Sequence, residues 1–258
     1  MESIINDYVN TDFKELLLKF DYSNLNNNLF YKGSYYNLES NLSSPDKIKS
    51  PGSEASLNKE SKDISNISNS ISNVSLVSLV SQVSHVSQDS SDIPRCYPEN
   101  YEIFRCFNYF NQCDLKYIIL GQDPYHNGQA NGLAFSINEG EKQPASLRII
   151  NKEYNRSMNT DTVLSDLSFL ANKGTLLLNT ALTVEKGKPG SHAKLWEQFT
   201  QFIIQELDNE NIMFFLWGNH AKKYKKFIKK AKIMESGHPS PLNRKNDFIG
   251  NDHFLEIK

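Results

Sequence analysis

The sequence has no run of eighteen or more apolar residues, and its first ten residues carry Glu2 and Asp7 rather than a basic stretch leading into an apolar one. We therefore expect neither a membrane span nor a secretory signal. Only three cysteines occur, and the spacing of Cys96, Cys106 and Cys113 fits neither a disulfide framework nor the paired cysteines of a zinc or iron–sulfur site. A reducing intracellular compartment is the expected setting.

What is present suffices for one globular domain with an appendage. Of the 258 residues, 38% are hydrophobic and 11% aromatic, so a core of ordinary size can be buried. The net charge of −2 hides an asymmetry, because residues 1–92 carry 7 Lys+Arg against 12 Asp+Glu, and residues 93–258 carry 21 against 18. The charge of the whole chain is therefore a poor guide to the partners of either part.

Composition divides the chain into three parts. Residues 64–92 are rich in Ser, Val and Asn and include successive Val-Ser-x triplets, a period that gives neither a strand nor a helix an apolar face. We expect a disordered, flexible insert there, with a Ser-rich regulatory segment as the alternative. Residues 1–63 form an N-terminal segment, in which residues 12–20 have the spacing of a short amphipathic helix that packs on the main domain. The main domain is 93–258.

The main domain has the pattern of an α/β protein. Four short apolar runs predict strands buried on both faces, at residues 115–120, 174–178, 212–217 and 232–235. Residues 191–207 predict a helix with one apolar face that begins at an N-cap, Ser191. We expect a three-layer α/β/α fold around a central, mainly parallel four-stranded sheet.

Each apolar run is followed by polar or Gly-containing residues, at 121–126, 179–180, 218–219 and 237–242. Because open parallel sheets bind ligands at the carboxyl ends of their strands, we expect these segments to form one site. In the first of them Asp123 follows a buried strand on a turn that Pro124 stiffens, which suits electrostatic or base catalysis. The alternative is an ordinary Asp-Pro turn.

Residues 121–137, GQDPYHNGQANGLAFSI, resemble the water-activating loop of the family 1 uracil-DNA glycosylases. GTLLLNTALTV from Gly174 and HPSPL from His238 resemble two further signatures of that family in the same order, and the resemblance covers roughly 93–258. It implies a base-excision repair enzyme that hydrolyses the N-glycosidic bond of deoxyuridine in DNA, releases uracil and leaves an abasic site. It also implies that no metal or cofactor is needed.

Two catalytic residues follow from the resemblance. Loss of uracil puts positive charge on the sugar and negative charge on the departing base, and both charges need stabilising. Asp123 matches the family's catalytic aspartate, which would stabilise the sugar cation and orient the attacking water. His238 matches the second catalytic residue, a neutral imidazole that would donate to the uracil 2-oxo group. No lysine stands at a catalytic position of the motifs, so a lyase step is not expected.

Four residues are expected, by the same resemblance, to bind the base. Asn179 would accept from the ring NH and donate to the 4-oxo group, a pattern that cytosine reverses. Tyr125 would fill the space that a thymine methyl group needs, and Phe135 would stack on the flipped base. Gln122 would contribute main-chain contacts. Taken alone, the Asn could cap a turn and the aromatic residues could belong to the core.

DNA contacts also follow from the match. A base inside a duplex must be extruded before it can react, and Leu242 matches the family's intercalating wedge. Loops with small residues let phosphates approach main-chain NH groups; the matching residues are Pro144, Ser146, Gly218, Asn219 and Ser240. Seven lysines between Lys222 and Lys232 predict a helix with a buried stripe and a basic face, either solvated or steering DNA.

Some positions depart from the family pattern. The loop after His126 is one residue shorter than usual, Asn127 and Asn131 are unusual there, and Asn219 replaces a typical serine.

Two other classes of protein compete with this interpretation. One is a DNA-binding relative that lost catalysis, and the intact catalytic residues argue against it. Iron–sulfur glycosylases need four clustered cysteines, and mismatch-specific glycosylases carry Asn where Asp123 stands.

The expected partner is uracil-containing DNA, single- or double-stranded, bound by a monomer that makes no membrane contact. Protein partners are left open. A nuclear location is expected from the repair role of the family alone, with a mitochondrial or cytoplasmic location as the alternatives.

Overall fold

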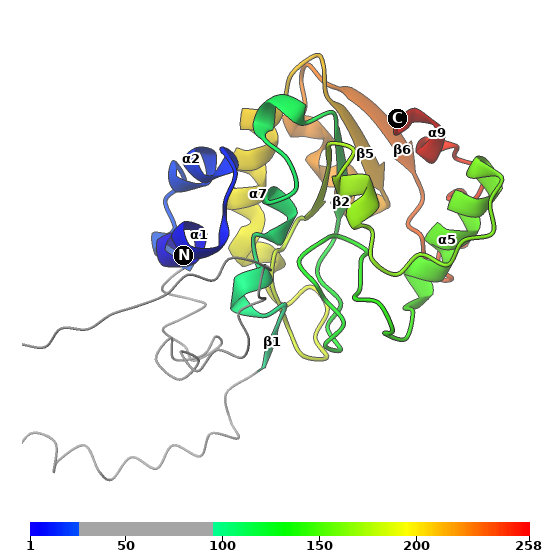
Figure 1. Ribbon diagram of the computed structural model, residues 1–258, viewed down its shortest axis with the longest axis horizontal. Helices are drawn as coiled ribbons and strands as arrows, with labels where there is room; N and C mark the ends of the chain where they lie inside the picture. Colours follow the sequence, from blue (N-terminus) through cyan, green and yellow to red (C-terminus); the bar gives the residue numbers. More distant parts are fainter. Residues whose placement is uncertain (26–94) are drawn as a thin grey trace, which may run out of the picture. The chain divides into compact units, whose positions relative to one another are not determined.

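The computed structural model describes residues 1–25 and 95–258, which belong to one compact unit (Figure 1). The 64–92 insert and the N-terminal segment beyond residue 25 lie outside the described residues. Within the described ranges, no helix combines the length and apolar character needed to cross a membrane.

Four parallel strands form the central sheet, in the order β3-β2-β5-β6. They are β2 (Tyr117–Gly121), β3 (Thr175–Asn179), β5 (Met213–Trp217) and β6 (Lys232–Ser236). Helices cover both faces, with α7 (Ala193–Leu207) on one side and α5 (Ala145–Met158) and α9 (His253–Glu256) on the other (Figure 1). The predicted fold class is therefore confirmed, and each strand matches a predicted run to within two residues.

Shorter elements connect and cover this sheet. The helices are α1 (Glu2–Tyr8), α2 (Phe13–Leu18), α3 (Ser23–Leu25), α6 (Ser168–Ala171) and α8 (Asn219–Lys222). Short 3-10 helices are η2 (Asn100–Glu102), η3 (Arg105–Phe107), η4 (Gln112–Asp114) and η5 (Lys223–Phe227). A separate antiparallel pair joins β1 (Cys96–Tyr97) to β4 (Val184–Glu185).

Burial differs between the two edge strands of the sheet, β3 and β6. Ile118 and Leu177 on β2 and β3, and Phe215 on β5, are almost fully buried. The expectation of burial on both faces is wrong for β6, in which Lys232 and Glu235 are exposed. Both β3 and β6 are edge strands of this sheet, but β3 packs against α6 and η3 and is buried throughout, whereas β6 leaves Lys232 and Glu235 on an open edge.

Helix α7 supplies much of the core, but it does not begin as predicted. Trp196, Phe199 and Ile203 on α7 are fully buried. The predicted N-cap at Ser191 is wrong, because the helix starts after His192 and no side chain caps it. The Ser191 hydroxyl oxygen instead accepts a hydrogen bond from the Glu185 amide at 2.9 Å, so it fastens the β4 turn rather than the helix.

The N-terminal residues pack into the same core. In α2, Phe13, Leu16 and Leu17 are buried, as the apolar spacing predicted. The ring of Phe20 lies 5.4 Å from that of Phe199 in an edge contact. The packing expected for this short amphipathic helix is thus confirmed.

The lysine-rich stretch is not one helix. It forms α8 and η5, and the chain becomes extended at Ile228. The Asp208 carboxylate accepts the main-chain amides of Lys229 and Lys230, which turns the chain out of the helical path. The predicted stripe is present, since Tyr224 and Ile228 are buried.

Candidate active site

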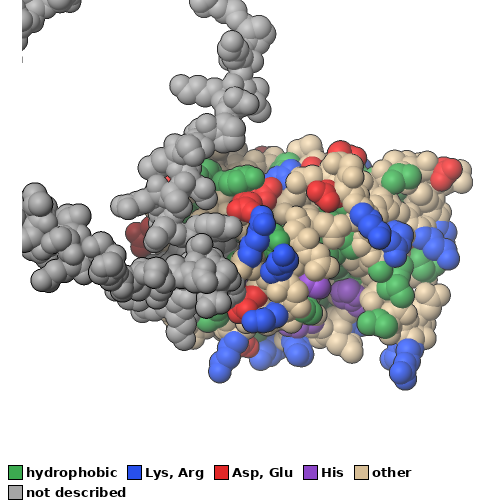
Figure 2. Space-filling view, turned by 90° about the horizontal axis from the view of Figure 1, so that it is seen from below, with side chains coloured by type: hydrophobic (Ala, Val, Ile, Leu, Met, Phe, Trp, Pro, Cys, Tyr) green, Lys and Arg blue, Asp and Glu red, His purple; other side chains and the backbone are tan. Residues whose placement is uncertain are grey.

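The predicted site segments converge at the carboxyl edge of the sheet. Gly121 on β2 is the register partner of Asn179 on β3, and Trp217 on β5 is that of Ser236 on β6. All four strands are parallel, so the loops that follow them leave the sheet at one edge. Figure 2 shows histidine side chains in the middle of a face with Lys and Arg side chains spread around them.

Asp123 lies on the loop after β2, partly shielded from solvent. Its Oδ2 accepts a hydrogen bond from the main-chain amide of Gly190, on the loop between β4 and α7. Burial raises the pKa of the Asp123 carboxyl, while the Gly190 amide, His126 and His220 act in the opposite direction. The carboxylate is therefore held by a fixed amide beside two histidines.

The main chain that carries Asp123 is fastened to the loop after β3. The Gln122 carbonyl accepts from the Thr180 hydroxyl at 2.8 Å and from the Ala181 amide at 3.0 Å. The Gly121 carbonyl accepts from the Thr180 amide at 3.0 Å. The Gln122 main chain, expected to contact the base, is thus rigid, but its carbonyl is occupied within the protein.

Asn179 and Phe135 meet at Gly121. Asn179 is only 5% exposed, and a Cβ at Gly121 would stand 2.3 Å from its Oδ1 and 3.4 Å from the Phe135 ring. Phe135 has a φ of 65°, a conformation that costs a non-glycine residue about 1 kcal/mol or more. Its ring centroid lies 5.3 Å from Trp217 and 6.0 Å from His238. The site therefore holds an aromatic surface next to a buried amide.

Tyr125 is held by two hydrogen bonds with a definite direction. Its hydroxyl donates to the Phe135 carbonyl at 3.2 Å, so the Ser146 hydroxyl, 2.7 Å away, must donate to it. Burial raises the pKa of the Tyr125 phenol far above its usual range, which keeps it neutral. The hydroxyl of Ser146, a residue whose loop is expected to contact DNA through main-chain NH groups, thus donates its proton to Tyr125. Pro144 precedes the first turn of α5.

His238 lies on the loop after β6, close to the end of β5. A Cβ at Gly218 would stand 2.7 Å from the Cβ of His238, so glycine is needed for this approach. Burial lowers the pKa of His238, and the nearby His220 lowers it further. The lowered pKa of His238 favours a neutral imidazole, which is the state that the resemblance implies.

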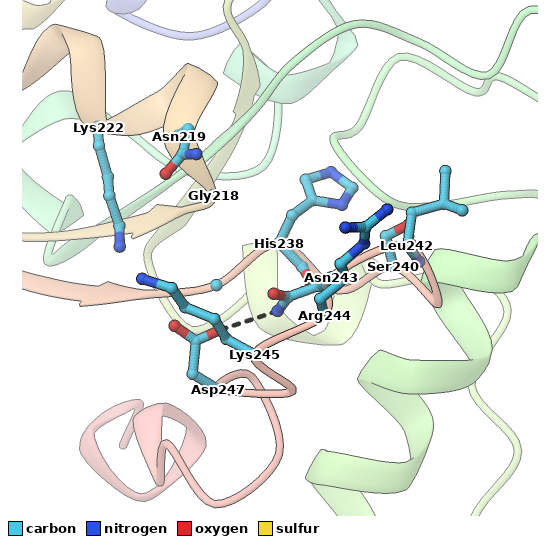
Figure 3. Close-up of a pocket in the computed structure, with 11 residues that line it drawn as sticks. Gly218, Asn219, Lys222, His238, Ser240, Leu242, Asn243, Arg244, Lys245 and Asp247 are labelled. Carbon is cyan, nitrogen blue, oxygen red and sulfur yellow. Dashed lines mark hydrogen bonds between the residues drawn. The ribbon is translucent and has the colours of Figure 1, made fainter.

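A cavity of about 480 Å³ lies beside His238 (Figure 3). Four of the six residues expected to contact DNA line it: Gly218, Asn219, Ser240 and Leu242. The Leu242 side chain is 89% exposed, while its amide donates to the Ser240 hydroxyl at 3.1 Å. An apolar side chain is thus held out into solvent on a braced turn.

Basic side chains surround the same cavity. Lys222 and Lys245 reach into it from α8 and from the loop after β6, and Arg244 extends toward His238 (Figure 3). Asp247 also lines it, and its carboxylate accepts from Asn243 at 2.8 Å. This surface suits an anionic strand next to an exposed wedge.

The unusual loop residue Asn131 has a structural role. It is fully buried, its Nδ2 donates to the Ser136 hydroxyl at 3.1 Å, and its Oδ1 accepts from the Leu133 amide at 3.3 Å. Arg105 donates to its carbonyl at 2.8 Å. Within the chain these bonds fasten the shortened loop just before Phe135.

Sequence reasoning assigned no role to three residues that hold the site together, Gly190, Thr180 and His220, although Thr180 belongs to the polar segment 179–180 expected at the site. Gly190 acts through its main-chain amide, which no side-chain pattern reveals. Thr180 follows the recognised Asn179, and His220 follows Gly218-Asn219, so each lay next to a motif residue. Their positions beside the motifs were the available signal.

A model of the uracil DNA glycosylase superfamily matches residues 107–258. A uracil-DNA glycosylase of Borrelia duttonii is 46% identical over 167 residues, which are 62% of this chain and 75% of the relative. One of Francisella philomiragia is 47% identical over 169 residues, 62% of this chain and 77% of the relative.

Solved structures of uracil-DNA glycosylases are also similar to this chain. The crystal structure of mimivirus uracil-DNA glycosylase has a TM-score of 0.55 and 31% identity, and covers 57% of this chain and 58% of the viral one. The match therefore spans less than two thirds of the viral chain. The wild-type UNG of Nitratifractor salsuginis, with a TM-score of 0.50 and 20% identity over 62% of this chain and 78% of its own, shares the fold.

Proposed function

The chain belongs to the uracil DNA glycosylase superfamily, and from that membership we propose that it hydrolyses the N-glycosidic bond of deoxyuridine in DNA. Uracil is released and an abasic site remains, the first step of base-excision repair. The observation that carries this proposal is the convergence of Asp123, Asn179 and His238 at one edge of a parallel sheet. The names of the bacterial relatives support the same reaction.

The two catalytic residues stabilise the two charges that develop during the reaction. As the C1′–N1 bond breaks, its electron pair leaves with uracil and the sugar becomes cationic. Asp123, fixed by the Gly190 amide, stabilises the sugar and orients the water whose oxygen bonds to C1′, and the proton that this water loses balances the negative charge of the departing uracil. His238, neutral because its pKa is lowered, donates to the 2-oxo group of the departing base.

The base is selected by a dry and rigid pocket. Asn179 reads the uracil edge, and its burial makes a mismatched base leave polar groups unpaired. Phe135 stacks on the base, while Tyr125, held in place by Ser146, excludes a 5-methyl group. Gln122 contributes its main chain near the base.

DNA is bound on the face that carries the cavity of Figure 3. Leu242 enters the base stack and takes the place of the extruded uridine. Lys222 and Lys245 neutralise phosphates near the lesion, and the Gly218–Asn219 and Ser240 turns approach the backbone. Both single and double strands are substrates, and the wedge matters for the double strand.

We further propose a monomer that needs no metal or cofactor and acts in the nucleus. Within the described part of the chain, no group of three or more His, Cys, Asp or Glu residues is placed to hold a metal ion. The nuclear location rests on the family's role, and the bacterial origin of the two relatives gives it no support. Light scattering of the full-length protein tests the monomeric state, and imaging of a tagged chain tests the nuclear location.

Base release from an oligonucleotide with a single uracil tests the reaction, with thymine and cytosine oligonucleotides as controls and EDTA present throughout. Uracil release that yields strand breaks only after alkali is the expected result. Breaks without alkali would contradict a monofunctional glycosylase. Tight DNA binding without release would favour the competing class, a relative that binds DNA without catalysis.

A further inference from the structure

His220 lies where two of the site's loops meet. It is the second residue of α8, after β5, and it is half-buried. Its Nε2 lies 2.9 Å from the hydroxyl oxygen of Thr180, on the loop after β3. The loop after β5 is thereby joined to the loop that fastens the Asp123 segment.

The protons available at Thr180 determine which group donates the hydrogen bond between His220 and Thr180. The Thr180 hydroxyl has one proton, and it goes to the Gln122 carbonyl, which can only accept. The His220 Nε2 must therefore donate to Thr180. Burial lowers the pKa of His220, and Lys223 lowers it further, so the ring is neutral with its proton on Nε2.

The chain of bonds ends at the peptide that carries the catalytic residue. The Gln122 carbonyl belongs to the peptide unit that joins Gln122 to Asp123, so its direction sets where the Asp123 side chain leaves the main chain. The far end of that side chain is fixed separately by the Gly190 amide. Two independent restraints therefore define the position of the carboxylate.

We propose that His220 is a positioning residue for Asp123: by donating to Thr180 it orients the hydroxyl that fixes the Gln122–Asp123 peptide. The role rests on the proposed function, in which Asp123 stabilises the sugar and orients water. His220 itself does not touch the substrate. Its loss is expected to slow the chemical step and to leave DNA binding unchanged.

The groups around His220 are consistent with this role. Lys223, Asp123 and Glu197 interact with its charge, and its ring centroid lies 6.2 Å from that of Tyr224. Lys223 opposes protonation, whereas Asp123 and Glu197 favour it. The donated Nε2 proton is present in both charge states, so the restraint persists when pH changes.

Paired variants of the full-length protein test the proposal on a single-stranded uracil oligonucleotide. His220→Leu and Thr180→Val each remove the donated bond and should lower kcat about tenfold, with KM changed less than about twofold. His220→Gln and Thr180→Ser keep a donor at each place and should stay within about threefold of the wild type. The Leu/Val double variant should lose no more than either single variant.

The proposal is overturned by equal losses in the donor-keeping and donor-lacking variants, by a loss confined to KM, or by additive losses. If His220→Leu does not fold, the comparison of Thr180→Val with Thr180→Ser decides the matter alone.

A readout without turnover separates this proposal from the proposed function. The Gly190 amide proton, bonded to Asp123, should shift upfield in the NMR spectrum of His220→Leu and Thr180→Val but not in the donor-keeping variants. No shift in either donor-lacking variant would overturn the positioning role. If the wild type releases no uracil but the resonance shifts as expected, the proposed function fails and the positioning role stands.

Discussion

A Cβ built on Gly121 would stand 2.3 Å from the Oδ1 of Asn179, its register partner on the neighbouring strand. The amide proposed to read the base therefore occupies the space that any other side chain at the end of β2 would fill. Gly121, which has no side chain to take part in the reaction, therefore affects base selection through the space that it leaves for Asn179.

Gly121→Ala should therefore lower kcat/KM for uracil release about 10- to 100-fold, because the added methyl group displaces the Asn179 amide. Overpacking should also lower the free energy of unfolding by about 1–3 kcal/mol. Steady-state kinetics and urea unfolding measure the two effects.

The Asn179→Ala background provides the control for this change. With the amide gone, Gly121→Ala should cost little further activity, although both single variants are impaired. A full additional loss in the double variant would mean that Gly121 acts on something other than Asn179.

Leu242→Ala should reduce uracil release from a duplex at least about tenfold more than from a single strand, since only the duplex must lose a stacked base. Leu255, 48% exposed on α9, supplies the matched control, and Leu255→Ala should leave both rates unchanged. Equal losses on the two substrates would refute the wedge role of Leu242.

Replacing Lys222 and Lys245 together by Gln should make DNA binding less sensitive to salt. The slope of log K against log salt concentration for a single strand should fall by about 1.4 if each lysine neutralises one phosphate. Lys229→Gln with Lys230→Gln removes the same charge away from the cavity and should change the slope less. Indistinguishable slopes for the two double variants would contradict the assigned DNA face.

Acid should weaken the packing of the C-terminal residues. The Trp217 indole donates to the Nδ1 of His253 at 2.9 Å, and burial lowers the pKa of His253 to about 4. Because the unfolded histidine titrates near 6.5, the unfolded chain binds the proton first. Stability is then lost as pH falls from 6.5 toward 4, by up to about 1.4 kcal/mol per pH unit.

Urea unfolding at pH 7 and pH 5 measures this effect, with His253→Gln as the control that cannot titrate. The wild type should lose more stability than the variant over this interval. The same pH dependence in both proteins would show that other groups account for the acid sensitivity.

The fold could be predicted from sequence because β2, β3 and β5 are short runs rich in Ile, Leu and Phe with no polar face. Such a run does not reveal what covers an edge strand, so the exposure of β6 was missed. The prediction of one helix for the lysine-rich stretch was also wrong, because the Asp208 carboxylate accepts hydrogen bonds from main-chain amides that a longer helix would have bonded internally.

The candidate site, like the fold, could be predicted from the sequence only in part. Asp123, Asn179 and His238 could be located because each stands inside a motif at a strand end. The supporting contacts could not, since Gly190 meets Asp123 across 67 residues and His220 meets Thr180 across 40. Spacing along the chain carries no record of such contacts between loops.

The single-turnover rate of Asp123→Asn on a uracil oligonucleotide shows whether the Asp123 carboxylate drives release of uracil. This rate should lie at least about 100-fold below that of the wild type, with DNA affinity unchanged, because the amide keeps the shape but loses the charge. Release of uracil at the wild-type rate would show that the charge of Asp123 is not needed for the reaction.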